Sequence, residues 1–112
     1  MTGTEIMLMV RERINDTAGS DPIDADSITW VNEFMRQIWF HRADSRIDDD
    51  GNPRAMTLIT ALGDTLDLSD RFKLDIMNGL AGEFLMWKAR NKEDQARAVQ
   101  WMGLYRKSIG VR

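Results

Sequence analysis

Apolar residues recur every three or four positions in four stretches of this 112-residue chain, which predicts four helices. The first predicted helix runs from Thr4 to about Asp16, and Ile6, Val10 and Ile14 form its single apolar stripe. Such a stripe needs only one buried contact surface. The polar stretch 17–25 then connects to the next helix, because its glycine, proline and small polar residues favour turns.

The second predicted helix begins at Asp26 or Ser27, two good N-cap residues, and reaches His41. It is apolar around much of its circumference, because Trp30 and Trp39 lie partly off the main apolar stripe. A helix of this kind must be covered on more than one side, either by the rest of the domain or by a neighbouring subunit.

The last two predicted helices run from Ser69 or Asp70 to about Asn91, and from Glu93 to Ser108. The short turn at 91–93 makes them an antiparallel hairpin. Gly110 is placed to end the last helix. Residues 108–112 then form a short C-terminal tail.

Between the second and third helices the pattern is not helical. Residues 44–56 are loop-like, since acidic residues cluster there and Gly51 and Pro53 break a helix. Residues 56–68 predict either a small hairpin or a single extended element, because threonine and isoleucine favour strands. The predicted fold is therefore a mostly α single domain over residues 1–112, with four helices and a short extended or hairpin element near 56–68.

Composition fits a globular protein, with 43% apolar and 29% charged residues and no cysteine. The early apolar run at 6–10 is too short for a signal peptide or a membrane span, so we expect a soluble protein. The net charge of −3 is unevenly placed. Residues 1–50 carry five arginines and eleven acids, whereas residues 88–112 carry seven basic and two acidic side chains. The two regions either attract each other between copies or form an ordinary solvated surface.

Residues with catalytic or metal-binding chemistry are scarce. His41 has no second histidine or cysteine with which to bind zinc, and its place favours a helix-end role. The acidic stretch at 48–52 resembles a calcium loop only in part, since Arg46 and Thr57 occupy the first and last ligand positions. No phosphate-binding loop or nucleophile elbow is present. We therefore expect no enzyme activity, metal or cofactor.

Two sets of residues favour a binding function, one toward nucleic acid and one toward other protein subunits. Lys88, Arg90 and Lys92 lie near aromatic residues, as in nucleic-acid-binding proteins, although the pI of about 5.1 is low for that class. Four tryptophans are many for this length, and tryptophan is enriched at the energetic centres of interfaces. We expect about two of them in the core and about two at subunit contacts.

Three segments carry a resemblance to a known family. They are "INDT" at 14–17, "LITALGDTLDLSDRF" at 58–72 and "GLAGEFLMWKARNKEDQARAVQWMGLYRKSI" at 79–109. In this order they resemble the head–tail adaptor (connector, or head-completion) proteins of tailed bacteriophages. Ser69 stands where that family usually has proline.

The resemblance implies a structural protein of the virion, made in the host cytoplasm and placed at the capsid vertex between head and tail. It implies a homo-oligomeric ring of twelve copies that binds the portal and the tail or next completion protein, and through which DNA passes without sequence-specific recognition. A small helical nucleic-acid-binding packaging or regulatory protein is the alternative.

Residues 63–72 either position the helical hairpin alone or also offer an edge for assembly, and "YRKSIGVR" at 105–112 is the candidate portal-docking segment. The candidate interface residues are Trp30, Trp39, Trp87, Trp101, Arg106, Lys107, Ile109, Val111, Arg112, Leu66 and Leu68.

Overall fold

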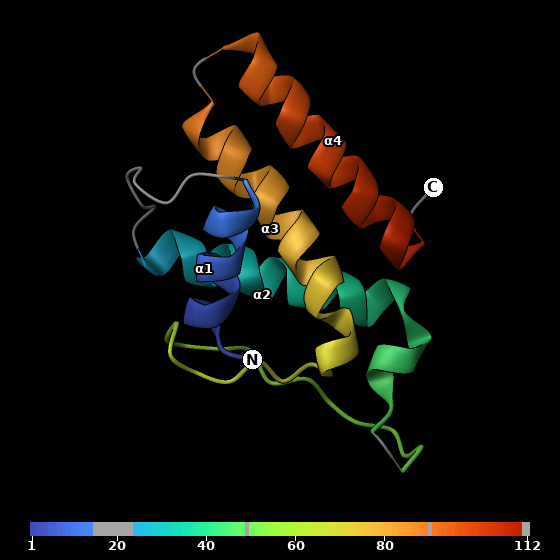
Figure 1. Cartoon of the computed structure of the whole chain (residues 1–112). Helices are drawn as coiled ribbons and strands as arrows, with labels where there is room; N and C mark the ends of the chain where they lie inside the picture. Colours follow the sequence, from blue (N-terminus) through green and yellow to red (C-terminus); the bar gives the residue numbers. More distant parts are fainter. Residues whose placement is uncertain (15–23, 49, 90, 111–112) are drawn as a thin grey trace.

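Helices carry most of the chain, as the apolar pattern predicted. The computed structural model describes residues 1–14, 24–48, 50–89 and 91–110. The mostly α fold with four helices, the last two forming an antiparallel hairpin, is confirmed for these residues (Figure 1). The elements are α1 (Gly3–Arg13), α2 (Asp24–His41), the short 3-10 helices η1 (Ala43–Arg46) and η2 (Asp70–Phe72), α3 (Lys73–Lys88) and α4 (Lys92–Ile109).

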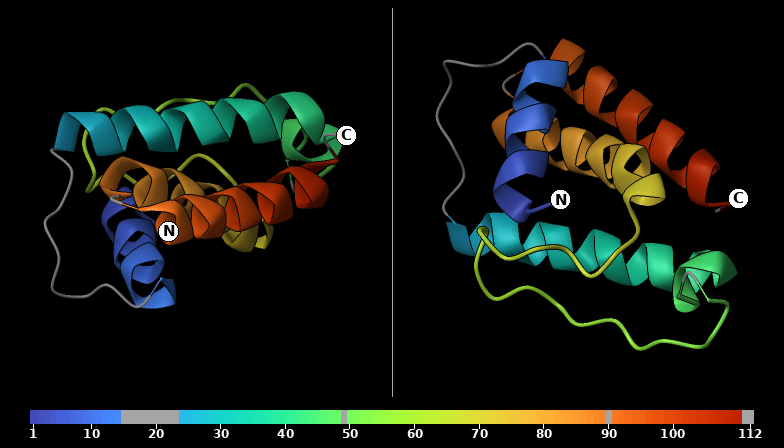
Figure 2. Two further views of the ribbon diagram at one scale, coloured as in Figure 1. Left: turned by 90° about the horizontal axis from the view of Figure 1, so that it is seen from above. Right: turned by 60° about the horizontal axis from the view of Figure 1, so that its bottom comes forward.

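The helices lie in three layers, with the α3–α4 hairpin between α2 on one side and α1 on the other (Figure 2). α3 is the central element, because it contacts each of the other three helices. Nine of its sixteen residues are buried, including both of its glycines. The side chains of α3 therefore face the core in almost every direction, while α1 and α4 each bury one stripe.

Local sequence explains how α1 and α4 begin and how α4 ends. The hydroxyl oxygen of Thr2 accepts a hydrogen bond from the Glu5 amide at 3.2 Å, which caps α1. The Asn91 side chain accepts from the Asp94 amide at 2.9 Å and caps α4. Gly110 follows α4 with a φ of 85°, the left-handed conformation that glycine adopts without strain. The predicted end at Gly110 is confirmed.

Predicted boundaries of three helices are wrong. α1 ends at Arg13 and is followed by Ile14, while Asp16 lies outside the described residues. α2 begins at Asp24, two residues earlier than predicted, and its first turn contains acidic residues that favour the positive end of the helix dipole. The third helix is also shorter than predicted, because the 3-10 helix η2 replaces its first turn and Lys88 is its last residue.

The middle of α3 lies against aromatic rings from both neighbouring helices. A Cβ atom at Gly79 would lie 2.8 Å from Cδ1 of Phe34 in α2 and 3.0 Å from Cδ1 of Tyr105 in α4. These two rings meet edge to face, with centroids 4.9 Å apart. The Tyr105 hydroxyl donates to Oε1 of Gln37 at 2.8 Å, and burial raises the pKa of Tyr105, which keeps that donor protonated. The contact thus joins α2, α3 and α4.

Residues 54–59 have no regular secondary structure and pass along α2, the chain turns at 60–64, and residues 65–68 run back. Exposed and less exposed residues alternate through 53–58, as in a strand with one covered face. Asn32 fastens the segment: its amide nitrogen donates to the Ile59 carbonyl and its oxygen accepts from the Ile59 amide, both at 2.9 Å. The N-terminal residues pair with its far end, since the Leu66 amide donates to the Met1 carbonyl at 2.8 Å.

The predicted extended element is confirmed, but the hairpin alternative is wrong. In the described part of the chain, 56–62 and 65–68 form no ladder with each other. The backbone amides that would form a ladder donate hydrogen bonds to side chains instead. Asp67 accepts from the Thr57 amide at 2.7 Å, and Asp64 accepts from the Thr60 and Ala61 amides at 2.9 and 3.0 Å. These last two bonds lower the pKa of the Asp64 carboxyl group.

Two glycine substitutions test the central contact. Gly79→Ala is expected to lower the free energy of unfolding by about 1–3 kcal/mol, because the new methyl group overpacks the site. Gly103→Ala in α4 is the matched control, since no neighbouring atom of the described residues lies within 4 Å of where its methyl group would sit. It should raise the free energy of unfolding by about 0.5–1 kcal/mol through helix propensity. Urea denaturation measures both, and equal effects at the two sites would contradict the packing described here.

Candidate functional site

A rigid aromatic surface lies where α2 and α3 come together. Trp87, in the last turn of α3, meets Trp30 of α2 edge to face, with ring centroids 6.3 Å apart. Phe84, one turn earlier, packs against Trp87 at 5.7 Å. Trp87 is 42% exposed although its neighbour Phe84 is fully buried. We call Trp30 and Trp87 the aromatic edge. In it, the indole of Trp87 is exposed to solvent next to the buried core residue Phe84.

The other two indoles have different surroundings. Trp39 lies under the Arg46 guanidinium, 5.5 Å from the ring centroid, and lines a hollow of about 320 Å³ beside the extended segment. Its buried Nε1 makes no hydrogen bond with any described residue. Trp101 packs against the core and under Arg13 of α1, at 5.9 Å. None of the four indoles is fully buried, and Trp30 and Trp101 are the two that contribute to the core.

Three of the other predicted interface residues belong to the chain's own core. Leu66, Leu68 and Ile109 are at most 6% exposed. The two leucines point inward because they alternate with Asp67, whose carboxylate pairs with Arg54. Ile109 lies on the same buried stripe of α4 as Ala98 and Tyr105. These three side chains therefore present no surface to a partner.

The remaining predicted interface residues are at the C-terminal end of α4 or follow it in the sequence. Arg106 and Lys107 are exposed in the last turn of α4. Val111 and Arg112 lie outside the described residues, so the candidate docking segment is described only as far as Gly110. The structure does not gather the predicted residues into one patch: the aromatic edge lies at the C-terminal end of α3, whereas Arg106 and Lys107 lie at the opposite end of the α3–α4 hairpin.

A polar cluster that the sequence did not predict joins the ends of α2 and α4 to the start of α3. The Arg42 guanidinium donates from Nε and Nη2 to the Asp44 carboxylate at 3.1 and 2.9 Å, and from Nη1 to the Ser108 carbonyl at 3.1 Å. Its Nη1 also lies 3.9 Å from the Asp75 carboxylate. The hydrogen bond from Arg42 lowers the pKa of the Asp44 carboxyl group. The sequence signal was Arg42 itself, which continues the apolar spacing of α2 four residues after Ile38 and stands just beyond the end of that helix.

The acidic turn at 48–52 is closed by its own hydrogen bonds. One carboxylate oxygen of Asp48 accepts from the amides of Asp50 and Asn52, both at 2.9 Å, and Gly51 has a φ of 82°. The described residues of the turn are exposed to solvent. Across the described residues, no group of three histidine, cysteine or acidic side chains could hold a metal ion. His41 is the last residue of α2, as expected, and its ring packs on Phe40.

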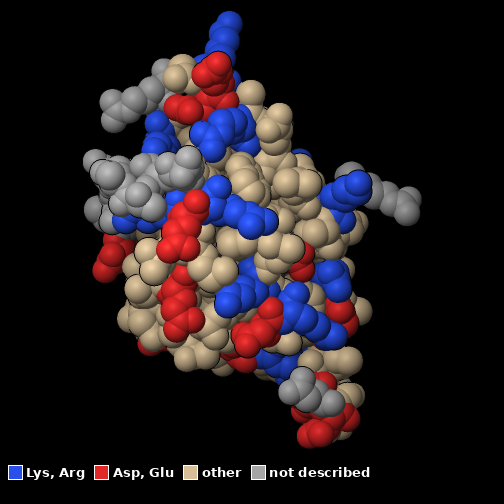
Figure 3. All heavy atoms as spheres, in the orientation of Figure 1, with Lys and Arg blue, Asp and Glu red and all other residues tan. Residues whose placement is uncertain are grey.

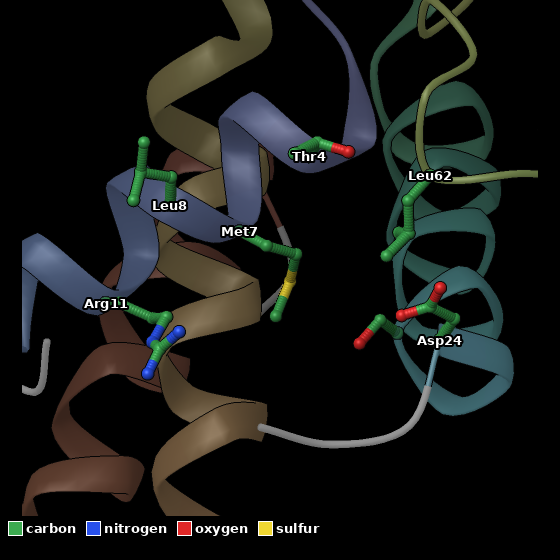
Figure 4. Close-up of a pocket in the computed structure, with 7 residues that line it drawn as sticks. Thr4, Met7, Leu8, Arg11, Asp24 and Leu62 are labelled. Atoms are coloured by element: carbon green, nitrogen blue, oxygen red, sulfur yellow. The ribbon is translucent and has the colours of Figure 1, made fainter. Parts of the chain in front are cut away.

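A hollow of about 210 Å³ lies between α1, the start of α2 and Leu62 (Figure 4). Met7, Leu8 and Leu62 supply apolar wall, and the hollow also has one arginine, Arg11, and one aspartate, Asp24. Among the described residues that line the hollow, Asp24 is the one carboxylate.

Comparison with known proteins adds no relative: no family model, curated protein or solved structure matches this chain. None of the described helices combines the length and apolar character of a bilayer-spanning segment. A function must therefore be argued from the aromatic edge and from the exposed charged residues of α1 and α4, such as Glu5, Glu12, Arg106 and Lys107.

Iodide quenching of tryptophan fluorescence tests the aromatic edge. Trp87→Phe is expected to remove more of the iodide-accessible emission than Trp101→Phe, because Trp87 is exposed and Trp101 is covered in part by Arg13. Both substitutions keep an aromatic ring, so their circular dichroism should match that of the wild type. A larger loss in Trp101→Phe would contradict the arrangement.

Acid titration tests the Arg42 cluster. A carboxyl group whose pKa is lowered by folding contributes stability above its ordinary pKa of 3.8, and loses it as the pH falls through the lower folded value. Asp44→Asn should therefore be less stable than the wild type at pH 7, and the difference should shrink below about pH 4. Asp50→Asn, whose carboxylate bonds to no described residue, is the control. Urea denaturation at a series of pH values measures the free energy of unfolding of each variant. A loss of stability in Asp44→Asn that does not change with pH would count against this role.

Proposed function

We propose that this chain is a structural subunit of a phage head–tail connector. In this proposal twelve copies form a ring between portal and tail, extend the DNA channel without reading its sequence, and provide a platform for the tail or the next completion protein. The chain is made in the host cytoplasm and incorporated at the capsid vertex of the virion. It acts by binding copies of itself and larger assemblies.

The observation that carries the proposal is the aromatic edge. A tryptophan that is 42% exposed and backed by a second indole and a buried phenylalanine is a rigid apolar anchor of the kind found at interface centres. Because Phe84 fixes Trp87 from behind, a partner gains contact area with little loss of side-chain entropy.

Two further features agree with an assembling subunit. The four-helix order, with an extended segment leading into a helical hairpin, is the order on which the resemblance to head–tail adaptors rests. A ring also needs two unlike surfaces on each subunit, so that the front of one copy meets the back of the next. The acidic N-terminal half and the basic C-terminal region provide such a difference in charge.

A nucleic-acid-binding role is the second candidate, and the exposed cations of α4 favour it. Lys92, Arg106 and Lys107 are exposed, and α4 has no acidic residue after Asp94. A gel shift that weakens with salt, and that disappears when Lys88, Arg90 and Lys92 are changed to Glu, would support this role over the connector.

Electron microscopy of the chain mixed with a portal from the same source tests the connector. The expected result is an additional ring stacked on the portal. Absence of any complex at micromolar concentration would contradict the proposal.

A matched pair of variants makes the test specific to the aromatic edge. Trp87→Ala should abolish the stacked ring, because it removes the anchor. Leu74→Ala lies on the same helix, is 52% exposed and points to a different side, so it should leave the ring intact. Equal behaviour of the two variants would show that the aromatic edge is not the contact.

A further inference from the structure

The outer face of α1 is an exposed leucine between two carboxylates. Glu5, Leu8 and Glu12 lie on one side of the helix, since they are three and four residues apart, and Leu8 is 57% exposed. Neither glutamate pairs with a described cation. Arg11 lies beside Leu8, since both line the hollow of Figure 4, and Arg13 lies over Trp101.

The outer face of α4 has the opposite charge around a similar apolar centre. Lys92, Val99 and Arg106 follow one another at intervals of seven residues, which places them on one side of the helix about 10 Å apart. Val99 is 62% exposed, and the two cations make no ion pair with a described residue. Gly103, on the same side, has no neighbouring described atom within 4 Å of where a side chain would begin. Another helix can therefore approach closely.

The two faces are opposite in charge around an apolar centre. Figure 3 shows acidic side chains in a column over α1 and an uncharged middle on α4. Glu5 and Glu12 are seven residues apart, about 10 Å along the helix, whereas Lys92 and Arg106 are fourteen residues apart, about 21 Å, so each cation reaches inward to its carboxylate. When Leu8 lies on Val99, each carboxylate comes within reach of the long side chain of Lys92 or Arg106. Burial of the apolar pair supplies the attraction, and the flanking charges fix the register.

We propose that the α1 face of one copy, Glu5–Leu8–Glu12, docks on the α4 face of the next copy, Lys92–Val99–Arg106. The two surfaces differ, so the contact is head-to-tail and repeats around a closed ring. This inference rests on the proposed ring and names the helices that join its subunits. It leaves the aromatic edge free for the portal or the tail.

The absence of native cysteine allows a direct test by disulfide trapping in solution, without a portal. One chain carries Leu8→Cys and the other Val99→Cys, and the mixture is oxidised and followed by non-reducing electrophoresis. The control partner carries Leu104→Cys, which is 53% exposed on the same helix but points to another side. The mixed disulfide with Val99→Cys should form about tenfold faster than with Leu104→Cys, because docking raises the local thiol concentration. Equal rates would overturn the proposal.

Charge exchange provides the second arm. Adding Glu5→Lys and Glu12→Lys to the Leu8→Cys chain should return cross-linking to the Leu104→Cys rate. Adding Lys92→Glu and Arg106→Glu to the Val99→Cys chain should then restore the faster cross-linking. Circular dichroism of each variant verifies that it is folded. Loss without restoration would overturn the pairing of these charges.

Failure of this proposal and failure of the connector function can be told apart. Trapping without any portal complex would support the α1–α4 contact and count against the connector. A stacked ring on the portal without preferential trapping would support the connector and overturn the α1–α4 contact.

Discussion

The whole arrangement depends on how closely α3 can approach its two neighbours. At Gly79 the backbone of α3 touches the rings of Phe34 and Tyr105, and at Gly82 it lies against Met102, whose Cγ would be 2.6 Å from an added methyl group. Helix propensity disfavours both glycines by about 1 kcal/mol each. The packing of two large aromatic side chains against the bare backbone offsets that cost. Without it, α2 and α4 could not share one central helix.

The central position of α3 determines what remains for the surface. Because α3 occupies the shared core, α1 and α4 each need to bury only one stripe, and their opposite sides stay open to solvent. The surface properties of this chain are therefore mainly the properties of two helix faces and of the aromatic edge where α3 ends. In an assembling protein these are the surfaces where selection can change a partner without disturbing the core.

Sequence patterns predicted the features that depend on neighbours in the chain. The end of α4 at Gly110 and the buried stripe of α1 follow from local chemistry, and they agree with the structure. The hairpin failed because Asn32 and two aspartates bond to the amides that a second strand would need, and residue propensities do not reveal such competition.

The candidate site was harder to predict for a similar reason. Alternation around Asp67 shows that Leu66 and Leu68 share a side, but it does not show whether that side faces the core or a partner. The Arg42 cluster joins residues up to 66 positions apart, so no local pattern reveals it. Conversely, the count of tryptophans drew attention to Trp87, although only the fold shows which indole is open.

The attachment of the extended segment has a consequence for motion. Residues 55–62 meet α2 through Ile59 and the two hydrogen bonds of Asn32, and the Leu62 carbonyl accepts from the Thr4 amide of α1 at 2.9 Å. The other described amides of the segment that form hydrogen bonds donate to nearby aspartates. Ile59 is the buried residue of this segment, so we expect the segment to open at a lower free energy than the helical hairpin unfolds. The amide protons of the segment should therefore exchange with solvent before those of α3.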